Sequence, residues 1–264
     1  MMRRLGGLAL LSLSVGCHPV ALPGTEGVFP GEPPTTAQWR DARRRLKTLR
    51  EVYAPTTSRT MNVEFDMKLA GGAGAMRSRG AIAVHPAGGL RIVMLGPGGT
   101  TAFDLWVCEG EFRLAIPAID HVVRGDARTP PEQLRGLPVE FLRWWFLAPM
   151  SGRLLNFMAA DEDGWWRFVL RDGESVVDVR GQGPSERPRT LHVIRHVHGG
   201  VQEVHSDGRA CGRVRYQQRP GGVVLKTVCE GWATERPPSR AFHDPDRPSR
   251  PCGALSSSAR GPRD

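Results

Sequence analysis

The segment from residue 61 to residue 69, MNVEFDMKL, alternates strictly between apolar and polar side chains. Val63, Phe65 and Met67 occupy every second position, and polar residues stand between them. Successive side chains of a β-strand point to opposite faces, so this alternation predicts a strand with one dry face and one wet face.

Similar segments recur along the chain and are separated by turn residues. The further candidate strands are 79–85, 89–95, 100–108, 111–117, 121–125, 165–171, 175–181, 190–198, 201–206, 209–218 and 223–232. Six candidates precede residue 137 and six follow residue 158, with no internal repeat. A sheet of this size with one apolar face must curl around an interior or be covered.

Two segments have helical patterns. Residues 36–54 place their large apolar side chains in one stripe: Trp39, Leu46, Leu49 and Tyr53. Residues 137–158, LPVEFLRWWFLAPMSGRLLNFM, contain a short helix that is apolar on most sides and ends at Pro149. Because such a helix has almost no polar face, we expect it to be buried and to cover the sheet.

The first seventeen residues have the pattern of an export signal. Arg3 and Arg4 precede an apolar run from Leu5 to Val15, which is too short to span a bilayer, because a spanning helix needs about 20 residues. The sequence SVGC ending at Cys17 resembles a bacterial lipobox, in which residues 1–16 are removed and the cysteine is lipidated. The alternative is an ordinary secretory signal with a chance cysteine.

Lipidation at Cys17 would fix the chain to a membrane. One acyl chain binds only marginally, at about 0.8 kcal/mol per buried methylene, but two or three chains make attachment effectively permanent. The residue after the cysteine is His18 rather than Asp, which resembles the pattern of outer-membrane lipoproteins. We therefore expect a lipid-anchored protein on the periplasmic face of the outer membrane.

Composition divides the rest of the chain into three parts. Residues 17–36 comprise the lipidated cysteine and a flexible tether rich in Pro, Gly and Thr. Residues 37–235 are long enough for one domain with a sizeable core. Residues 236–264 are rich in Pro, Ser and Arg, which predicts a disordered tail.

The chain carries a net charge of +9. Nucleic acid is not expected as a partner, because the export signal directs the protein to the envelope. The positive charge is concentrated in residues 37–54, where six Lys and Arg stand against Asp41 and Glu51. Two interpretations remain open: a solvated helix face, or a basic face that meets anionic head groups beside a membrane.

With Cys17 lipidated, four cysteines remain, and an oxidising periplasm allows them to pair. Paired residue numbers across an antiparallel hairpin have a constant sum. A loop at 219–221 gives a sum of 440, which is also the sum for Cys211 and Cys229, so we expect a disulfide between them. The sequence suggests no partner for Cys108 or Cys252.

The segment LHVIRHVHGGVQEVH, residues 191–205, is a candidate metal site. A two-residue turn at Gly199–Gly200 would pair His196 with Glu203 and put four imidazoles and one carboxylate on the same face: His192, His196, His198, Glu203 and His205. Such a set could bind zinc, but a polar outer sheet face is the commoner explanation, and we predict no metal.

Two stretches resemble the LolB-like outer-membrane lipoproteins and their soluble LolA-like relatives. Residues 88–110, GGLRIVMLGPGGTTAFDLWVCEG, resemble the family's third strand, Gly/Pro loop and fourth strand. Residues 137–152, LPVEFLRWWFLAPMSG, resemble its central helix through Pro138, Leu142, Arg143, Trp144 and Pro149.

The resemblance implies a mainly β, α+β fold. It would be an incomplete antiparallel barrel of about 11–12 strands, closed by an N-terminal helix and a central Trp-rich helix. Acyl chains of lipoproteins or lipids would lie in the hollow. The candidate lining residues are Val63, Phe65, Met67, Ile82, Ile92, Met94, Phe103, Leu105, Phe112, Leu114, Trp144, Trp145 and Phe168. The same side chains could equally form an ordinary filled core, and both alternatives remain open at this point.

The favoured function is a non-enzymatic, membrane-anchored lipoprotein that carries acyl chains during outer-membrane lipoprotein localisation or envelope assembly. A periplasmic carrier protein is a candidate partner, and no cofactor is expected. The alternative is a scaffold of the same fold that acts through a protein partner. A hydrolase is less favoured, because the chain has no G-x-S-x-G and no Cys-x-x-Cys, and GPGGTT lacks the lysine of a phosphate-binding loop. The family's exposed loop leucine is also missing from Gly96–Gly99.

Overall fold

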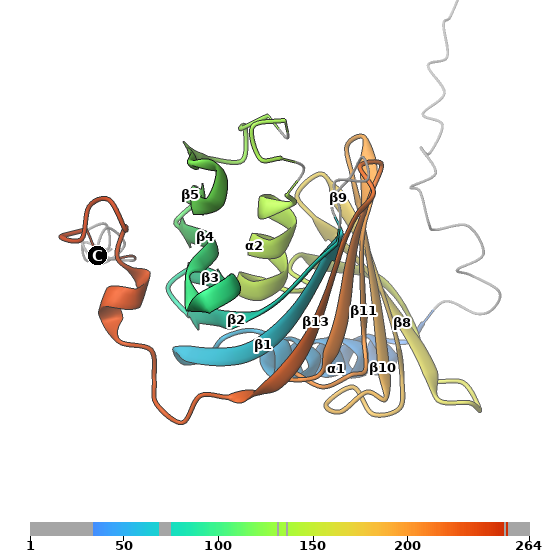
Figure 1. The fold of residues 1–264 in the computed structure, drawn as a ribbon. Helices are drawn as coiled ribbons and strands as arrows, with labels where there is room; N and C mark the ends of the chain where they lie inside the picture. The colour runs from blue at the N-terminus through green and yellow to red at the C-terminus, as the bar shows by residue number, and fades with distance from the viewer. Residues whose placement is uncertain (1–33, 69–74, 131, 136, 251, 253–264) are drawn as a thin grey trace, which may run out of the picture.

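The computed structural model describes residues 34–68, 75–130, 132–135, 137–250 and 252 (Figure 1). The predicted export signal, Cys17 and most of the tether lie outside the described residues. Within the described part of the chain, no helix has both the length and the hydropathy needed to cross a membrane.

The strands form one antiparallel sheet of 13 members. Their bounds are β1 (Arg59–Lys68), β2 (Ala75–His85), β3 (Gly89–Leu95), β4 (Thr101–Cys108), β5 (Glu111–Ile116), β6 (His121–Gly125), β7 (Arg153–Met158), β8 (Trp165–Asp172), β9 (Ser175–Gln182), β10 (Thr190–Val197), β11 (Gly200–Ser206), β12 (Arg213–Arg219) and β13 (Val223–Trp232).

The sheet consists of two meanders joined at the middle. The strand order is β6-β5-β4-β3-β2-β1-β13-β12-β11-β10-β9-β8-β7, so β1 pairs with both β2 and β13. We call β1–β6 the first wing and β7–β13 the second wing. The two free edges, β6 and β7, are consecutive in sequence but lie at opposite ends of the strand order, so the sheet is not closed into a barrel.

The alternation read from the sequence sets the faces of the sheet. In β1, Val63, Phe65 and Met67 are buried, while the polar residues between them are half-buried or exposed. The sheet curves so that the apolar face is concave and surrounds the central helix (Figure 1). The predicted mainly β fold, an incomplete antiparallel barrel with two helices, is therefore confirmed, with 13 strands instead of about 11–12.

Helix α1 (Thr36–Tyr53) begins at a capping box and packs one stripe inward. The Thr35 hydroxyl accepts from the backbone of Gln38, whose side chain accepts from the backbone of Thr35. Its buried residues are Ala42, Leu46, Leu49 and Tyr53. Helix α2 (Val139–Leu147) lies between the two wings (Figure 1).

Strand β7 was missed by the sequence analysis, which assigned residues 137–158 as one covering segment. The helix ends at Leu147, and the chain then turns through Gly152, whose φ is +106°. A Cβ at this position would lie 2.3 Å from the carbonyl oxygen of Arg171, so only glycine fits. The turn redirects residues 153–158 to pair with β8 as an edge strand.

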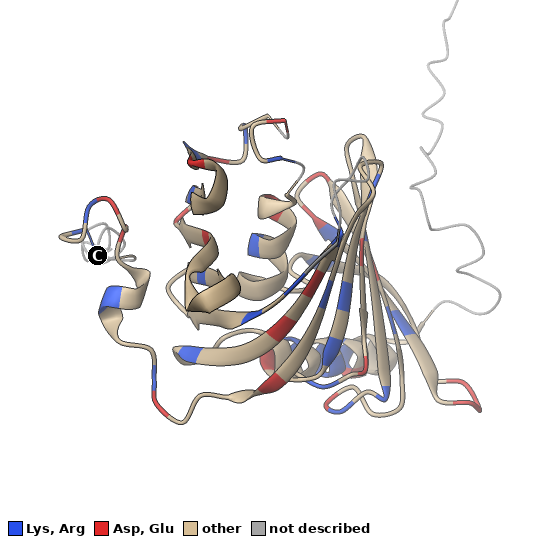
Figure 2. Ribbon diagram, in the orientation of Figure 1, with Lys and Arg blue, Asp and Glu red and all other residues tan. Residues whose placement is uncertain are grey.

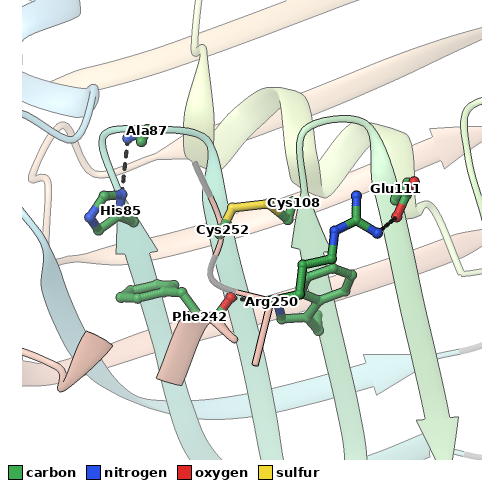
Figure 3. The surroundings of a disulfide bond; sticks show 8 residues. His85, Ala87, Cys108, Glu111, Phe242, Arg250 and Cys252 are labelled. Carbon is green, nitrogen blue, oxygen red and sulfur yellow. Dashed lines mark hydrogen bonds and ion pairs between the residues drawn. A yellow bond between two sulfur atoms is a disulfide. The ribbon is translucent and has the colours of Figure 1, made fainter. Parts of the chain in front are cut away.

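The predicted disordered tail is wrong over its first half. Residues 236–250 and 252, which we call the C-terminal strap, pack on the outer face of the first wing, where Phe242 is buried. The indole Nε1 of Trp106 donates to the carbonyl of Phe242 at 2.9 Å, and Cys252 forms a disulfide with Cys108 (Figure 3). Composition missed this packing because the strap is held by a few specific contacts and not by an apolar stripe.

Ion pairs complete the attachment of the strap. Arg124 on β6 binds the carboxylates of Asp244 and Asp246, and Arg113 on β5 lies 2.8 Å from Asp246. Arg250 lies 3.1 Å from Glu111 (Figure 3). Since Asp244 is fully buried, its charge depends on these arginine contacts and on backbone donors.

The structure also contains the predicted disulfide between Cys211 and Cys229, but the predicted register is wrong by one residue. Tyr216 pairs with Leu225, a sum of 441, because the hairpin loop has four residues instead of three. Cys211 lies just before β12, outside the ladder. There the backbone N–H of Cys229 donates to the carbonyl of Gly212 at 3.0 Å, and the two cysteine Cα atoms are 5.2 Å apart.

Candidate functional site

The candidate site is the interior between the concave face and α2. All thirteen residues that the sequence analysis chose as lining are buried, and all belong to one hydrophobic cluster. They come from both wings and from α2, and the burial of those on the strands agrees with the inward-facing positions that alternation predicts.

Helix α2 fills this interior with aromatic rings. Phe141, Trp145 and Phe146 surround Tyr216 of β12, with ring centroids 6.2, 6.2 and 5.9 Å from the tyrosine ring. Tyr53 of α1 lies 5.7 Å from Trp145. The helix therefore acts as an aromatic plug in the hollow of the sheet.

The two tyrosines add no charge to this interior. Burial raises the pKa of Tyr53 and of Tyr216 well above the ordinary value, so both hydroxyls stay protonated at neutral pH.

The open space inside is small in this conformation. A cavity of about 40 Å³ lies where α1, α2 and both wings meet, and of the thirteen candidates only Val63, Ile82 and Trp145 line it. This is room for about three water molecules, whereas a pocket for a long ligand measures a few hundred Å³. Of the two alternatives left open by the sequence, the filled core describes this conformation.

Polar contacts hold one end of the plug. The Nε1–H of Trp144 donates to Oδ2 of Asp172 at 2.8 Å and also contacts Oγ of Ser151 at 3.2 Å. Ser151 Oγ donates to the same carboxylate at 2.8 Å, and the guanidinium of Arg195 lies 5.0 Å from the Trp144 ring centroid. We call these four residues the α2 latch.

A cleft of about 460 Å³ lies against the latch, outside the plug. It is lined by latch residues, by Glu140, Arg143 and Leu147 of α2, and by the turns at Gly88 and Gly110. Space into which the end of α2 can shift is therefore already present. Sequence reasoning missed the latch because its members are distant in the chain and have no shared motif.

The histidine cluster differs from the predicted one. The hairpin turn is at His198 and Gly199, so His192 pairs with His205, and His196 pairs with Val201 instead of Glu203. Among the described residues, His192, Glu203 and His205 bring one donor atom each within 4.8 Å of one another. The Nε2 atoms of His192 and His205 lie 3.9 and 3.4 Å from Oε2 of Glu203.

The surroundings of this cluster fit a metal poorly. Glu203 already pairs with Arg219, and Arg180 and Arg215 place positive charge beside the imidazoles. Burial, His205 and Arg180 lower the pKa of His192 to about 4. The cluster is explained as part of the polar outer face of the sheet.

The comparisons with known proteins support the fold. No protein-family model and no curated protein matches the sequence. A solved LolA superfamily protein from Nitrosomonas europaea is 12% identical with a TM-score of 0.51, and the match covers 77% of this chain and 97% of that chain. A DUF1329 family protein from Desulfovibrio piger is 11% identical with a TM-score of 0.52, covering 78% and 97%.

The fold class of this chain is an open antiparallel sheet wrapped around a central helix. This chain has the LolA-like fold, as the resemblance in its sequence predicted. At these identities, the likeness shows the fold alone.

Proposed function

We propose that this protein carries acyl chains of lipoproteins or lipids in the bacterial envelope, and that it does so without catalysis. The observation that carries the proposal is the interior: a concave apolar wall whose filling is contributed largely by one short helix held by a few polar contacts. An acyl chain would take the place of the α2 side chains when the helix moves aside.

The two sides of such an exchange are comparable in energy. A 16-carbon chain has about 14 methylenes, so its burial contributes on the order of 10 kcal/mol gross at about 0.8 kcal/mol each. Exposing all six buried apolar side chains of α2 would cost about 1.5–3 kcal/mol each, which is of the same order. The exchange therefore requires a shift of α2 that keeps some of these side chains covered. A carrier must also release its cargo, and this cost keeps binding reversible.

The proposed anchor is lipid on Cys17, with the domain facing the periplasm at the outer membrane. The two disulfides of the structure agree with an oxidising compartment. Replacing Cys17 with serine is expected to move the protein from the membrane fraction to the soluble fraction. Retention of the C17S variant in membranes would contradict lipid anchoring.

The second candidate is a tethered scaffold that acts through a protein partner, for example a periplasmic carrier. The observation that favours it is the filled interior, with a cavity of only about 40 Å³. A scaffold needs no movement of α2 and no bound lipid.

Native mass spectrometry of protein extracted gently from its own membranes separates the two functions. The carrier predicts a population with a noncovalent mass addition that disappears on organic extraction. As a matched control, substituting Phe65 with aspartate puts a charge into the hollow and should abolish the addition. Repeated absence of bound lipid from the wild-type protein would contradict the carrier and favour the scaffold.

A further inference from the structure

A groove between α1 and β7 is lined by arginines and by no acidic residue. It has a volume of about 630 Å³, and its lining residues are Thr36, Trp39, Arg40, Arg43, Leu46, Arg50, Arg153 and Leu154. Four of these eight residues are arginines, and none is acidic.

The arginines of the groove differ from the other basic residues of α1. Arg44 and Arg45 pair with Asp41, and Lys47 pairs with Glu51. Within the described part of the chain, no ion pair involves the four groove arginines. The neutralised charges and the charges without an ion pair therefore belong to different residues of one basic helix (Figure 2 shows the charged positions along α1).

The groove arginines are also available to a ligand. Arg40, Arg43 and Arg153 are exposed, and Arg50 is fixed at the base of the groove by donating to the carbonyls of Met150 and Gly152 at 2.8 and 2.6 Å. The aromatic ring of Trp39 packs edge-on against Phe157 with centroids 5.0 Å apart. The guanidinium of Arg43 lies 5.8 Å from the centroid of the Trp39 ring. A half-buried tryptophan beside exposed arginines is typical of a surface that meets the head-group region of a bilayer.

The position of the groove along the chain points to the same occupant. Thr36, the first residue of α1, is part of the lining, so the described part of the chain begins beside the groove. Thr36 lies nineteen positions after Cys17 in the sequence, a reach of at most about 65 Å. An anchored chain would keep this part of the domain close to the membrane, which raises the effective concentration of head groups around it.

We infer that the groove docks the domain onto anionic phospholipid head groups of the bilayer that holds the anchor. The inference rests on the proposed anchoring, and it adds an orientation: α1 and β7 face the membrane. The phosphates would bind the guanidinium groups, and Trp39 would sit at the level of the head groups.

The test uses the mature chain from residue 17 with Cys17 replaced by serine, so that neither a lipid anchor nor the apolar signal contributes. The elements and disulfides described here lie within residues 34–252, so this chain retains all of them. Sedimentation with sucrose-loaded vesicles of phosphatidylglycerol, and with vesicles of phosphatidylcholine, gives the two partition coefficients at 50 and at 300 mM salt.

The groove variant replaces Arg40, Arg43 and Arg153 with glutamine. Each basic residue near an anionic surface strengthens binding about fivefold, so the loss is expected to be on the order of 100-fold. The matched control replaces the paired residues Arg44, Arg45 and Lys47 with glutamine. It removes the same charge from the molecule and should lose less than about fivefold.

Two outcomes would overturn the docking surface. The first is equal, weak binding of the wild-type chain to both kinds of vesicle. The second is an equal loss in the two triple variants, which would show that net charge acts without the groove. Lysine in place of the three groove arginines should restore binding. The carrier function is tested separately by bound lipid in native mass spectrometry, so either proposal can fail alone.

Discussion

Replacing Trp144 with phenylalanine tests whether α2 is a movable plug. The change keeps an aromatic ring in the interior and removes the Nε1–H that donates to Asp172 at 2.8 Å. A hydrogen bond to a charged acceptor contributes about 1.5–3 kcal/mol. Because this bond exists only in the closed arrangement, its loss should favour the open arrangement by about that amount.

If acyl chains bind the open arrangement, affinity should rise when the latch is weakened. The apparent dissociation constant equals the intrinsic constant divided by the open fraction, so 1.5–3 kcal/mol converts to roughly a 10- to 100-fold gain. Equilibrium dialysis with radiolabelled palmitate measures this gain, and urea unfolding of the same sample reports the accompanying loss of stability.

The matched control is Trp166 replaced with phenylalanine. Its Nε1–H donates to the carbonyl of Gly183 at 2.7 Å, in the second wing and away from α2. This variant should lose stability without gaining affinity. The reasoning is refuted if the Trp144 variant loses stability while its affinity for palmitate stays unchanged or falls.

Three further outcomes can be measured on the purified protein. In the chain-entropy model, replacing Cys108 and Cys252 with serine opens a 144-residue loop and should lower the free energy of unfolding in urea by about 5 kcal/mol. Replacing Cys211 and Cys229, which are 18 residues apart, should lower it by about 3 kcal/mol. Equal losses or the reverse order would contradict the model. The fold lowers the pKa of His192 from 6.5 to about 4. Between these pH values the imidazole is protonated in the unfolded chain and neutral in the folded one, so the free energy of unfolding falls as the pH falls. This residue should remove at most about 2 kcal/mol of stability between pH 7.5 and pH 5. A glutamine variant at this position should show a shallower loss, and equal pH slopes would refute the assignment. Zinc should leave the Tm unchanged, because the carboxylate of the histidine cluster already pairs with an arginine; a rise of several degrees would instead identify a metal site.

The fold was predictable from the sequence where its determinants are local. Alternation in residues 61–69 identified the inward face of β1, and the eleven candidate interior residues that lie on strands are all buried, as are the two on α2. Strand β7 was missed because Leu154 and Phe157 do not alternate, and because the turn before it depends on a close backbone approach at Gly152. Contacts of that kind are set by tertiary structure and leave no periodic signal.

The C-terminal strap left one signal in the sequence that was not used. Trp106 stands on the face of β4 opposite to Phe103, Leu105 and Val107, and a large apolar residue on a wet face indicates that something covers it. The cover is Phe242 with its neighbours, 136 residues further along the chain. The α2 latch left no comparable signal, because Asp172 and Arg195 are ordinary polar residues of two different strands until the fold brings them to Trp144.

The order of the strands links separation of the two wings to movement of α2. The single connection between β6 and β7 contains α2, and these two strands are the opposite free edges of the sheet. Separation of the wings therefore changes the distance that the segment carrying the helix has to span. Under the proposed function, a ligand that widens the hollow is expected to move the sheet and the helix together.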